Sequence, residues 1–228
     1  MQLIVKSNYM EISLVAAGII SDAITASPRM KLCLAAGNTP TGTYRELVRL
    51  HRSAGLDFSN VTFFYLDEYF GIPASHRESF RSYLERELFD HINATRTNIY
   101  APGSRYDETI QNSGGIDLLI CGIGGNGHIA FNEPGSAMDS RTRIVDLAES
   151  TIEGLRGKFR PEEMPRQGIT MGLATIMASR QILMLANGKK KAGILERALK
   201  GPVTTDVPAS MLQSHPGLTV ITDQEISN

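Results

Sequence analysis

An imidazole and a carboxylate lie close together in a glycine-rich stretch of the chain, residues 122–135. The stretch reads Gly-Ile-Gly-Gly-Asn-Gly-His-Ile-Ala-Phe-Asn-Glu-Pro-Gly. His128 and Glu133 are near enough in sequence to share a site, where the acid would fix the imidazole tautomer. A single histidine in a loop is usually structural. A histidine wrapped in glycines and followed by Asn-Glu-Pro is harder to explain by packing, so the pair is a candidate for proton transfer.

Residues 122–127 also match the pattern G-x-G-x-x-G, which binds a pyrophosphate in dinucleotide-binding proteins. That fingerprint requires a long helix to open at the last glycine, so that the helix N-terminus meets the pyrophosphate. Here Pro134-Gly135 closes the segment soon afterwards. We therefore exclude a dinucleotide site.

Two neighbouring carboxylates, Asp67 and Glu68, follow directly after an apolar run that ends at Leu66. We expect one of them to point into a crevice, where partial desolvation would raise its pKa toward the range that suits a general base. The alternative is that both acids cap the next turn in water. Composition alone slightly favours that alternative.

A third polar segment, Gly37-Asn38-Thr39-Pro-Thr41-Gly-Thr, follows an apolar run and leads into a helical pattern. A glycine-bearing turn at a helix start offers unpaired backbone N–H groups and a positive dipole end to an anion, so the segment predicts a phosphate site. It lacks the Gly-Lys-Ser/Thr ending of a nucleotide-binding P-loop. Plain helix capping by Thr39 or Thr41 is an equally good interpretation.

Two further segments could bring cations to that anion site. Arg166 begins Arg-Gln-Gly-Ile-Thr before an apolar helical pattern, and Lys189 to Lys191 follow a strand pattern. Lysines at a helix start oppose the helix dipole, and a bound phosphate would offset that cost. The alternative for three consecutive lysines is a solvated face.

The elements that must position these residues follow an α/β rhythm. Short apolar runs predict strands at 32–36, 61–66, 116–121, 181–186 and 218–221, and helical patterns cover 8–25, 41–52, 79–91, 170–179 and 189–200. Continuous apolar strands indicate a single-domain, Rossmann-like, mostly parallel sheet with helices on both faces, spanning 1–228. Ligands of such sheets bind at the carboxyl ends of the strands. The least regular stretch is 132–166.

Composition restricts the class of partner. The chain has 228 residues, 42% of them hydrophobic, and a formal net charge of −1. This excludes disorder as the main state, and it disfavours nucleic-acid or anionic-membrane binding, so a small-molecule partner is expected. Cys33 and Cys121 sit in apolar runs and read as buried reduced thiols, which favours the cytoplasm. The richest early apolar stretch, 12–20, is too short to span a bilayer.

The polar segments together resemble the glucosamine-6-phosphate deaminase (isomerase) family, in the larger group that includes 6-phosphogluconolactonases. The strings that carry the resemblance are 34–44 (Leu-Ala-Ala-Gly-Asn-Thr-Pro-Thr-Gly-Thr-Tyr), 66–69 (Leu-Asp-Glu-Tyr), 89–92 (Phe-Asp-His-Ile), 127–134 (Gly-His-Ile-Ala-Phe-Asn-Glu-Pro), 140–143 (Ser-Arg-Thr-Arg) and 188–192 (Gly-x-x-Lys-Ala). The likeness spans nearly the whole chain.

The resemblance implies conversion of an amino-sugar 6-phosphate to fructose 6-phosphate and ammonia, without a metal or redox cofactor. It implies that His128 opens the pyranose ring with the help of Glu133, and that Asp67 moves a proton between C2 and C1. The residues implied to hold the phosphate are Gly37, Asn38, Thr39 and Lys191, with a cation from the region of Arg166.

Two departures from the family pattern stand out. Asn126 occupies a position where many members have Asp, so we expect its amide oxygen to accept a hydrogen bond from the imidazole, with Glu133 supplying the charge. Val145-Asp146 replaces the basic and hydroxyl residues of the longer, allosterically controlled members. Activation by N-acetylglucosamine 6-phosphate is therefore not expected.

Three rival functions stay open at this point. The chain could deaminate galactosamine 6-phosphate, the C4 epimer. It could be a 6-phosphogluconolactonase, although Asn132-Glu133-Pro134 argues against that branch. It could also be a non-catalytic sugar-phosphate sensor, although the α/β pattern leaves no room for a DNA-binding module. A homo-oligomer is possible.

Overall fold

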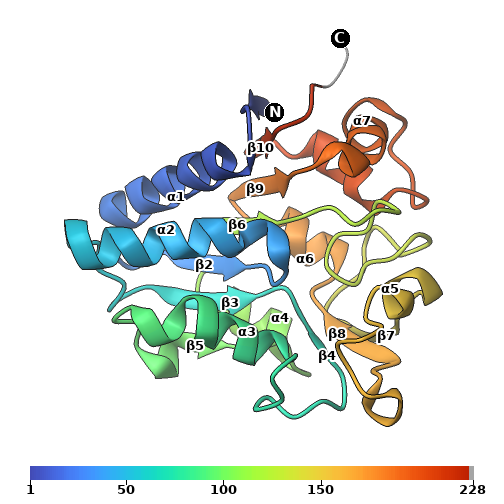
Figure 1. The fold of residues 1–228 in the computed structure, drawn as a ribbon, viewed down its shortest axis with the longest axis horizontal. Coiled ribbons are helices and arrows are strands. Elements are labelled where there is room, and N and C mark those ends of the chain that lie inside the picture. The colour runs from blue at the N-terminus through green and yellow to red at the C-terminus, as the bar shows by residue number, and fades with distance from the viewer. Residues whose placement is uncertain (226–228) are drawn as a thin grey trace.

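A seven-stranded parallel sheet forms the centre of the protein (Figure 1). The structure, a computed structural model, describes residues 1–225. The strand order is β1-β10-β9-β6-β2-β3-β5, and each neighbouring pair is parallel. The strands are β1 (Gln2–Val5), β2 (Lys31–Leu34), β3 (Thr62–Tyr65), β5 (Ile99–Tyr100), β6 (Leu118–Cys121), β9 (Gln181–Ala186) and β10 (Leu218–Thr222). All five predicted strands are present, and the two short outer strands β1 and β5 were not predicted.

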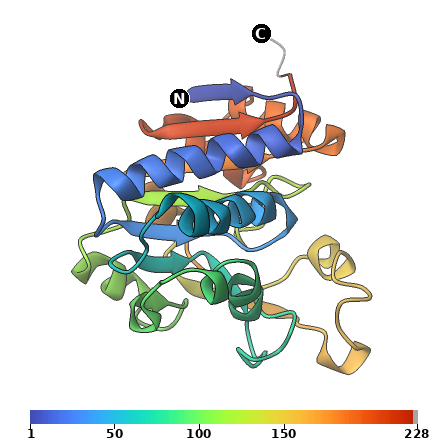
Figure 2. The same ribbon diagram turned by 60° about the vertical axis from the view of Figure 1, so that its left-hand side comes forward.

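Helices cover both faces of this sheet, as the sequence predicts (Figures 1 and 2). They are α1 (Tyr9–Ala26), α2 (Asn38–Ala54), α3 (Phe80–Glu87), α4 (Tyr106–Asn112), α5 (Glu149–Glu153), α6 (Leu173–Met177) and α7 (Ala192–Lys200). Short 3₁₀ turns lie at Phe89–His91, Arg96–Asn98, Pro161–Glu163, Lys189–Lys191 and Pro208–Ser214. The five predicted helices are confirmed in place, whereas α4 and α5 were missed because each is too short to show a clear period.

Alternate residues of the central strands enter two separate cores. Leu32 and Ile120 pack with residues of α1, α2 and α3, whereas Cys33 and Cys121 pack with residues of α4, α6 and α7. Because side chains alternate across a strand, a strand buried on both faces reads as a continuous apolar run. This explains why continuous apolar runs were enough to identify the central strands.

Helix α1 is long and apolar enough to cross a membrane by length and composition, with a mean hydropathy of 1.3 over its 18 residues. The apolar segment is thus longer than the stretch 12–20 that stands out in the sequence. In the structure it is a core helix, because Ile12, Ala16 and Ile20 are fully buried in the core beside α2.

A second, three-stranded antiparallel sheet corrects the sequence analysis. It consists of β4 (Asp67–Tyr69), β8 (Gln167–Thr170) and β7 (Arg143–Asp146), in the order β4-β8-β7. Thr170 therefore ends a strand and does not begin a helix, and the stretch 132–166 contains β7 and α5. Strands of three or four residues carry too few side chains to establish an alternating pattern. This small sheet continues directly from β3 through Leu66 and so carries Asp67 beyond the edge of the main sheet.

Candidate active site

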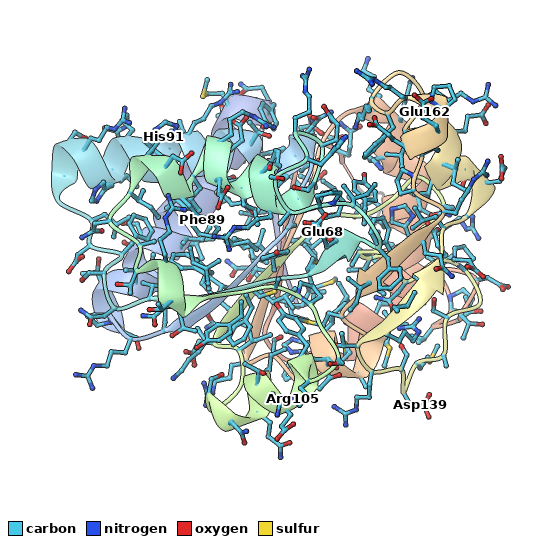
Figure 3. All side chains as sticks on the ribbon, turned by 90° about the horizontal axis from the view of Figure 1, so that it is seen from below. Glu68, Phe89, His91, Arg105, Asp139 and Glu162 are labelled. Carbon is cyan, nitrogen blue, oxygen red and sulfur yellow. The ribbon has the colours of Figure 1, made fainter. Side chains whose placement is uncertain are left out.

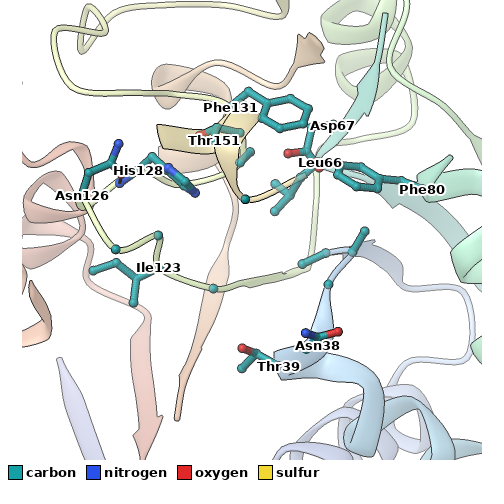
Figure 4. A pocket seen from close by; sticks show the side chains of 18 of the residues that line it. Asn38, Thr39, Leu66, Asp67, Phe80, Ile123, Asn126, His128, Phe131 and Thr151 are labelled. Carbon is teal, nitrogen blue, oxygen red and sulfur yellow. Dashed lines mark hydrogen bonds between the residues drawn. The ribbon is translucent and has the colours of Figure 1, made fainter. Parts of the chain in front are cut away.

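A cavity of about 680 Å³ opens at the carboxyl edge of the parallel sheet (Figure 4). The segments that follow β2, β3, β6 and β9 all line it, because parallel strands end at the same edge. Asp67, Asn126, His128, Lys191 and residues 37–39 share this cavity. Thus seven of the nine residues that the sequence analysis named line one cavity. Glu133 is not among the lining residues but is hydrogen-bonded to His128, and Arg166 lines another hollow.

The two adjacent carboxylates have separate roles in the structure. Asp67 lines the cavity at 7% exposure, and no donor within residues 1–225 bonds its carboxylate. Burial, followed by the charge of Glu68, raises the pKa of Asp67 well above its ordinary value. Glu68 instead accepts hydrogen bonds from the backbone of Phe80 (2.8 Å) and Arg81 (2.9 Å), so it caps α3. Figure 3 shows Glu68 within the body of the molecule, unlike the peripheral Glu162.

His128 and Glu133 form a hydrogen-bonded pair. Nδ1 of the imidazole lies 3.0 Å from Oε2 of Glu133. Burial opposes ionisation of Glu133, but hydrogen bonds and charge from His128, with further bonds from Thr151 and Asn126, lower its pKa to about 2. The carboxylate therefore stays ionised and binds Nδ1. Nε2 is left without a partner among the described residues, on an imidazole that lines the cavity.

The side chain of Asn126 does not bond the imidazole, which the sequence predicts as its partner, but bonds two neighbouring groups. The side-chain oxygen accepts from the backbone N–H of His128 at 3.2 Å, not from the imidazole. The side-chain amide donates to Oε2 of Glu133 at 2.7 Å. Asn126 therefore supports the ionised carboxylate, and Glu133 alone holds the ring nitrogen.

The glycines of the 122–127 stretch make room for side chains. A methyl group at Gly124 would lie 2.2 Å from Nε2 of His128, and one at Gly127, whose φ is +92°, would lie 2.8 Å from a methyl of Val207. The first helix after Gly127 in the described chain is α5, so no helix N-terminus opens at the last glycine. The helix that the dinucleotide fingerprint requires is therefore not found at this position among the described residues.

A buried amide fixes the loop that carries Glu133. Asn132 is fully buried and donates to the carbonyls of Ile129 (3.0 Å) and Met171 (2.8 Å). Its oxygen accepts from Arg143 of β7 at 2.9 Å. Ala130, within the same loop, adopts a left-handed conformation with φ of 52°. The small sheet thus holds the loop in a conformation that an isolated chain would disfavour.

The turn before α2 presents two free backbone amides. Gly37 is the N-cap residue with φ of 116°, and no side chain caps the helix there. The N–H groups of Asn38 and Thr39 bond no acceptor in residues 1–225. Capping by a threonine is wrong, because Thr39 donates to Asn187 Oδ1 (3.1 Å) and Thr41 donates to the Gly37 carbonyl (3.0 Å). We call residues 37–39 the amide cradle.

Two lysines lie at this cavity, and one of them was missed. Lys191 donates to the carbonyl of Ile123 at 2.6 Å, and desolvation lowers its pKa. Lys189 and Lys190 are exposed, so the solvated-face interpretation holds for them. Lys158 also lines the cavity, from the segment that the sequence analysis treated as irregular. That lysine carried no local signal, because no motif or period surrounds it.

The structure does not bring Arg166 to the cavity. Arg166 lines a different hollow, together with Phe70, His76 and Glu163. The reason is the register of the small sheet, in which β8 pairs Gln167 with Asp146 at the end of β7 farthest from the Thr170–Asp67 pairing. The prediction that Arg166 brings a cation to the anion site was therefore wrong, although Arg166 does precede an apolar segment.

A segment around α5 completes the cavity wall. Ser150, Thr151 and Leu155 line the cavity, and Thr151 also donates to Oε1 of Glu133. Aromatic rings form the neighbouring wall: Phe80 and Phe131 are stacked with centroids 5.7 Å apart. The cavity therefore combines a buried carboxylate, an imidazole, free backbone amides and an apolar wall.

Comparison with known proteins places these features in a family. The family model for glucosamine-6-phosphate isomerases/6-phosphogluconolactonase matches residues 10–221. A glucosamine-6-phosphate deaminase of Clostridium perfringens (strain SM101 / Type A) is 43% identical over 99% of this chain and 98% of its own. One of Geobacillus sp. (strain WCH70) is 45% identical over 99% and 94%. A solved structure of a monomeric glucosamine-6-phosphate deaminase superposes with a TM-score of 0.94 at 37% identity, covering 99% and 98%.

Proposed function

The chain belongs to the family of glucosamine-6-phosphate isomerases and 6-phosphogluconolactonases, and on that premise we propose that it converts glucosamine 6-phosphate and water to fructose 6-phosphate and ammonia. Full-length relatives at 43% and 45% identity carry that activity in their names. The string Asn132-Glu133-Pro134 supports the deaminase branch over the lactonase branch.

The amide cradle and the lysines would anchor the phosphate. The N–H groups of Asn38 and Thr39 are unpaired within residues 1–225, and they lie at the positive end of the α2 dipole. Lys191, which is half-buried, lines the same cavity, and Lys158 adds a second cation. An anchored phosphate removes much of the substrate's orientational freedom, which can supply several kcal/mol of the barrier.

Ring opening would use the His128–Glu133 pair. Glu133 holds the Nδ1 hydrogen, so Nε2 carries the lone pair and can take the proton of the anomeric hydroxyl. The same nitrogen can return a proton to the ring oxygen as the C1–O5 bond breaks. The product of this step is the open-chain amino aldehyde.

Asp67 would then catalyse the isomerisation. Its carboxylate removes the proton from C2, the aldehyde oxygen gains a proton, and an enolamine forms. Return of a proton to C1 gives an iminium at C2, which adds water and expels ammonia to leave the ketone of fructose 6-phosphate. Because burial raises the pKa of Asp67, the ionised form is a stronger base than an ordinary carboxylate.

The single observation that carries this proposal is the placement of Asp67 and His128 on two sides of one cavity (Figure 4). The test is release of ammonia and fructose 6-phosphate from glucosamine 6-phosphate. Galactosamine 6-phosphate and 6-phosphogluconolactone serve as competing substrates in the same assay. Faster turnover of either one, or tight binding without turnover, would refute the proposal.

We also propose a cytoplasmic location. Cys33 and Cys121 are both buried free thiols, and burial raises the pKa of Cys121 to about 12. Thiols of this kind are typical of reducing compartments. For assembly, the solved relative at 37% identity is a monomer, which supports a monomer here over the possible homo-oligomer. Sedimentation of the purified protein tests this.

A further inference from the structure

Two tyrosines, one on α1 and one on α3, hold the backbone of the amide cradle. The hydroxyl of Tyr83, on α3, donates to the carbonyl of Gly37 at 2.6 Å. The hydroxyl of Tyr9, at the start of α1, donates to the carbonyl of Asn38 at 2.9 Å. Neither tyrosine is among the residues that line the cavity. Their contact with a ligand site is therefore indirect, through the main chain.

Because the peptide bond is planar, a contact that fixes a carbonyl also fixes the direction of the next N–H group. In a trans peptide the carbonyl and the N–H of the next residue point in opposite directions. The carbonyl of Gly37 shares a plane with the N–H of Asn38, and the carbonyl of Asn38 shares a plane with the N–H of Thr39. Two consecutive carbonyls held from outside thus orient two consecutive amides away from the tyrosines. These are the two amides that have no acceptor within residues 1–225.

Each tyrosine hydroxyl is fixed by a second contact. The Tyr83 hydroxyl lies 2.8 Å from Oγ1 of Thr41, whose one proton can be donated to this hydroxyl or to the Gly37 carbonyl, 3.0 Å away. The Tyr9 hydroxyl accepts from the backbone N–H of Gly42 at 2.8 Å. Both hydroxyls are therefore held at two points, which restricts their orientation.

The packing of α1 on α2 makes the Tyr9 contact specific. A methyl group at Gly42 would lie 2.3 Å from the hydroxyl oxygen of Ser13 and 3.1 Å from that of Tyr9. Only glycine lets α1 approach this closely. Tyr83 is held by an edge contact with Tyr44, whose ring centroid is 6.4 Å away.

We propose that Tyr9 and Tyr83 are positioning residues for phosphate recognition, acting through the peptide planes of the amide cradle. The inference rests on the proposed function, in that the cradle must bind the 6-phosphate of the substrate. It assigns roles to two side chains that never touch the ligand. Amides that are already oriented lose no orientational freedom when the anion binds. Removal of either hydroxyl leaves its amide less well oriented, and this weakens phosphate binding.

The experiment uses Tyr83→Phe and Tyr9→Phe in the full chain, with Tyr100→Phe as the matched control. Tyr100 also loses a hydroxyl, but that hydroxyl bonds nothing in the described structure and its residue is 37% exposed. Binding of inorganic phosphate is measured by calorimetry, and KM and kcat are measured with glucosamine 6-phosphate. We expect each cradle variant to raise both the phosphate Kd and KM about three- to tenfold, with kcat changed less than about twofold.

The outcomes separate this inference from the proposed function. Wild-type turnover together with an unchanged Kd and KM in both variants would overturn the inference and leave the function standing. Absence of ammonia release by the wild type would refute the function, while the phosphate Kd still decides the role of the tyrosines. A loss confined to kcat would overturn the inference. If Tyr83→Phe does not fold, Thr41→Val removes the other hydroxyl on the Gly37 carbonyl and should shift Kd in the same direction, with rescue in Thr41→Ser.

Discussion

The imidazole of His128 lies directly against the backbone of Gly124. A methyl group on Gly124 would lie 2.2 Å from Nε2 and 2.3 Å from Cε1 of the ring, and Gly124 does not adopt a positive φ. The glycine is therefore required for space and not for backbone conformation. The histidine can face the cavity only because its neighbour has no side chain.

Gly124→Ala should displace the imidazole and lower kcat by about 100-fold or more, because proton transfer by a positioned side chain contributes a factor of that size. Unfolding temperature should change little, since the loop can shift outward. The control is Gly18→Ala in α1, where an added methyl meets nothing within 4 Å. Equal kcat in the two variants would contradict the assigned role of His128.

Asp67→Asn should abolish isomerisation but leave the affinity for inorganic phosphate nearly unchanged, because it removes a base and not an anchor. It should also stabilise the fold at neutral pH. The folded-state pKa of Asp67 lies above the unfolded value, so its stabilising contribution exists only at low pH and is lost as pH rises through the folded pKa. The neutral amide of the variant carries no such penalty.

Thermal unfolding of wild type and Asp67→Asn at about pH 7 and about pH 3.5 shows whether the ionised Asp67 destabilises the fold. The variant should unfold a few degrees higher at neutral pH, with a smaller gap at acid pH. Glu68→Gln is the matched carboxamide control. It removes a charge that caps α3 through two backbone bonds, so it should lower the unfolding temperature and retain turnover. A lower unfolding temperature for both variants at neutral pH would refute the assignment.

Asn126→Asp should shift the acid limb of the pH–rate profile upward. The substitution replaces an amide that donates to Glu133 at 2.7 Å with a second carboxylate, which raises the pKa of Glu133 from its value of about 2. Glu133 then loses its charge at a higher pH and releases the imidazole. Asn126→Ala removes the donor without adding charge and should shift the limb less. Superimposed profiles of wild type and Asn126→Asp would show that this contact has no role.

Substitution of three cations tests whether the phosphate binds in the cavity or in the hollow that Arg166 lines. Lys191→Met and Lys158→Met should each raise KM and the phosphate Kd about tenfold, with a smaller change in kcat, because charged hydrogen bonds are worth more than neutral ones. Arg166→Met should leave both values close to those of wild type, since Arg166 lines the other hollow. A KM rise in Arg166→Met alone would restore the expectation drawn from the sequence.

The sequence alone determined the five inner strands of the main sheet and the polar segments that follow them. Strands buried on both faces read as apolar runs, so the central sheet was visible without any tertiary information. Strand ends are local features, so Asp67, His128 and the turn at Gly37 could be identified as polar groups at one edge. The short strands β4, β7 and β8 were invisible, because three or four residues do not establish a period.

Only the tertiary structure decided which of several similar groups faces the cavity. Asp67 and Glu68 are adjacent and chemically alike, and a strand's alternation sends one into the cavity and the other onto α3. Lys158 and Arg166 lie eight residues apart in the sequence. Lys158 lines the cavity from the segment after α5, whereas the pairing of β8 with β7 leaves Arg166 at the other hollow. Residue type and order are properties of the chain. The direction in which a side chain points and the register of a strand depend on contacts between segments that are distant in sequence.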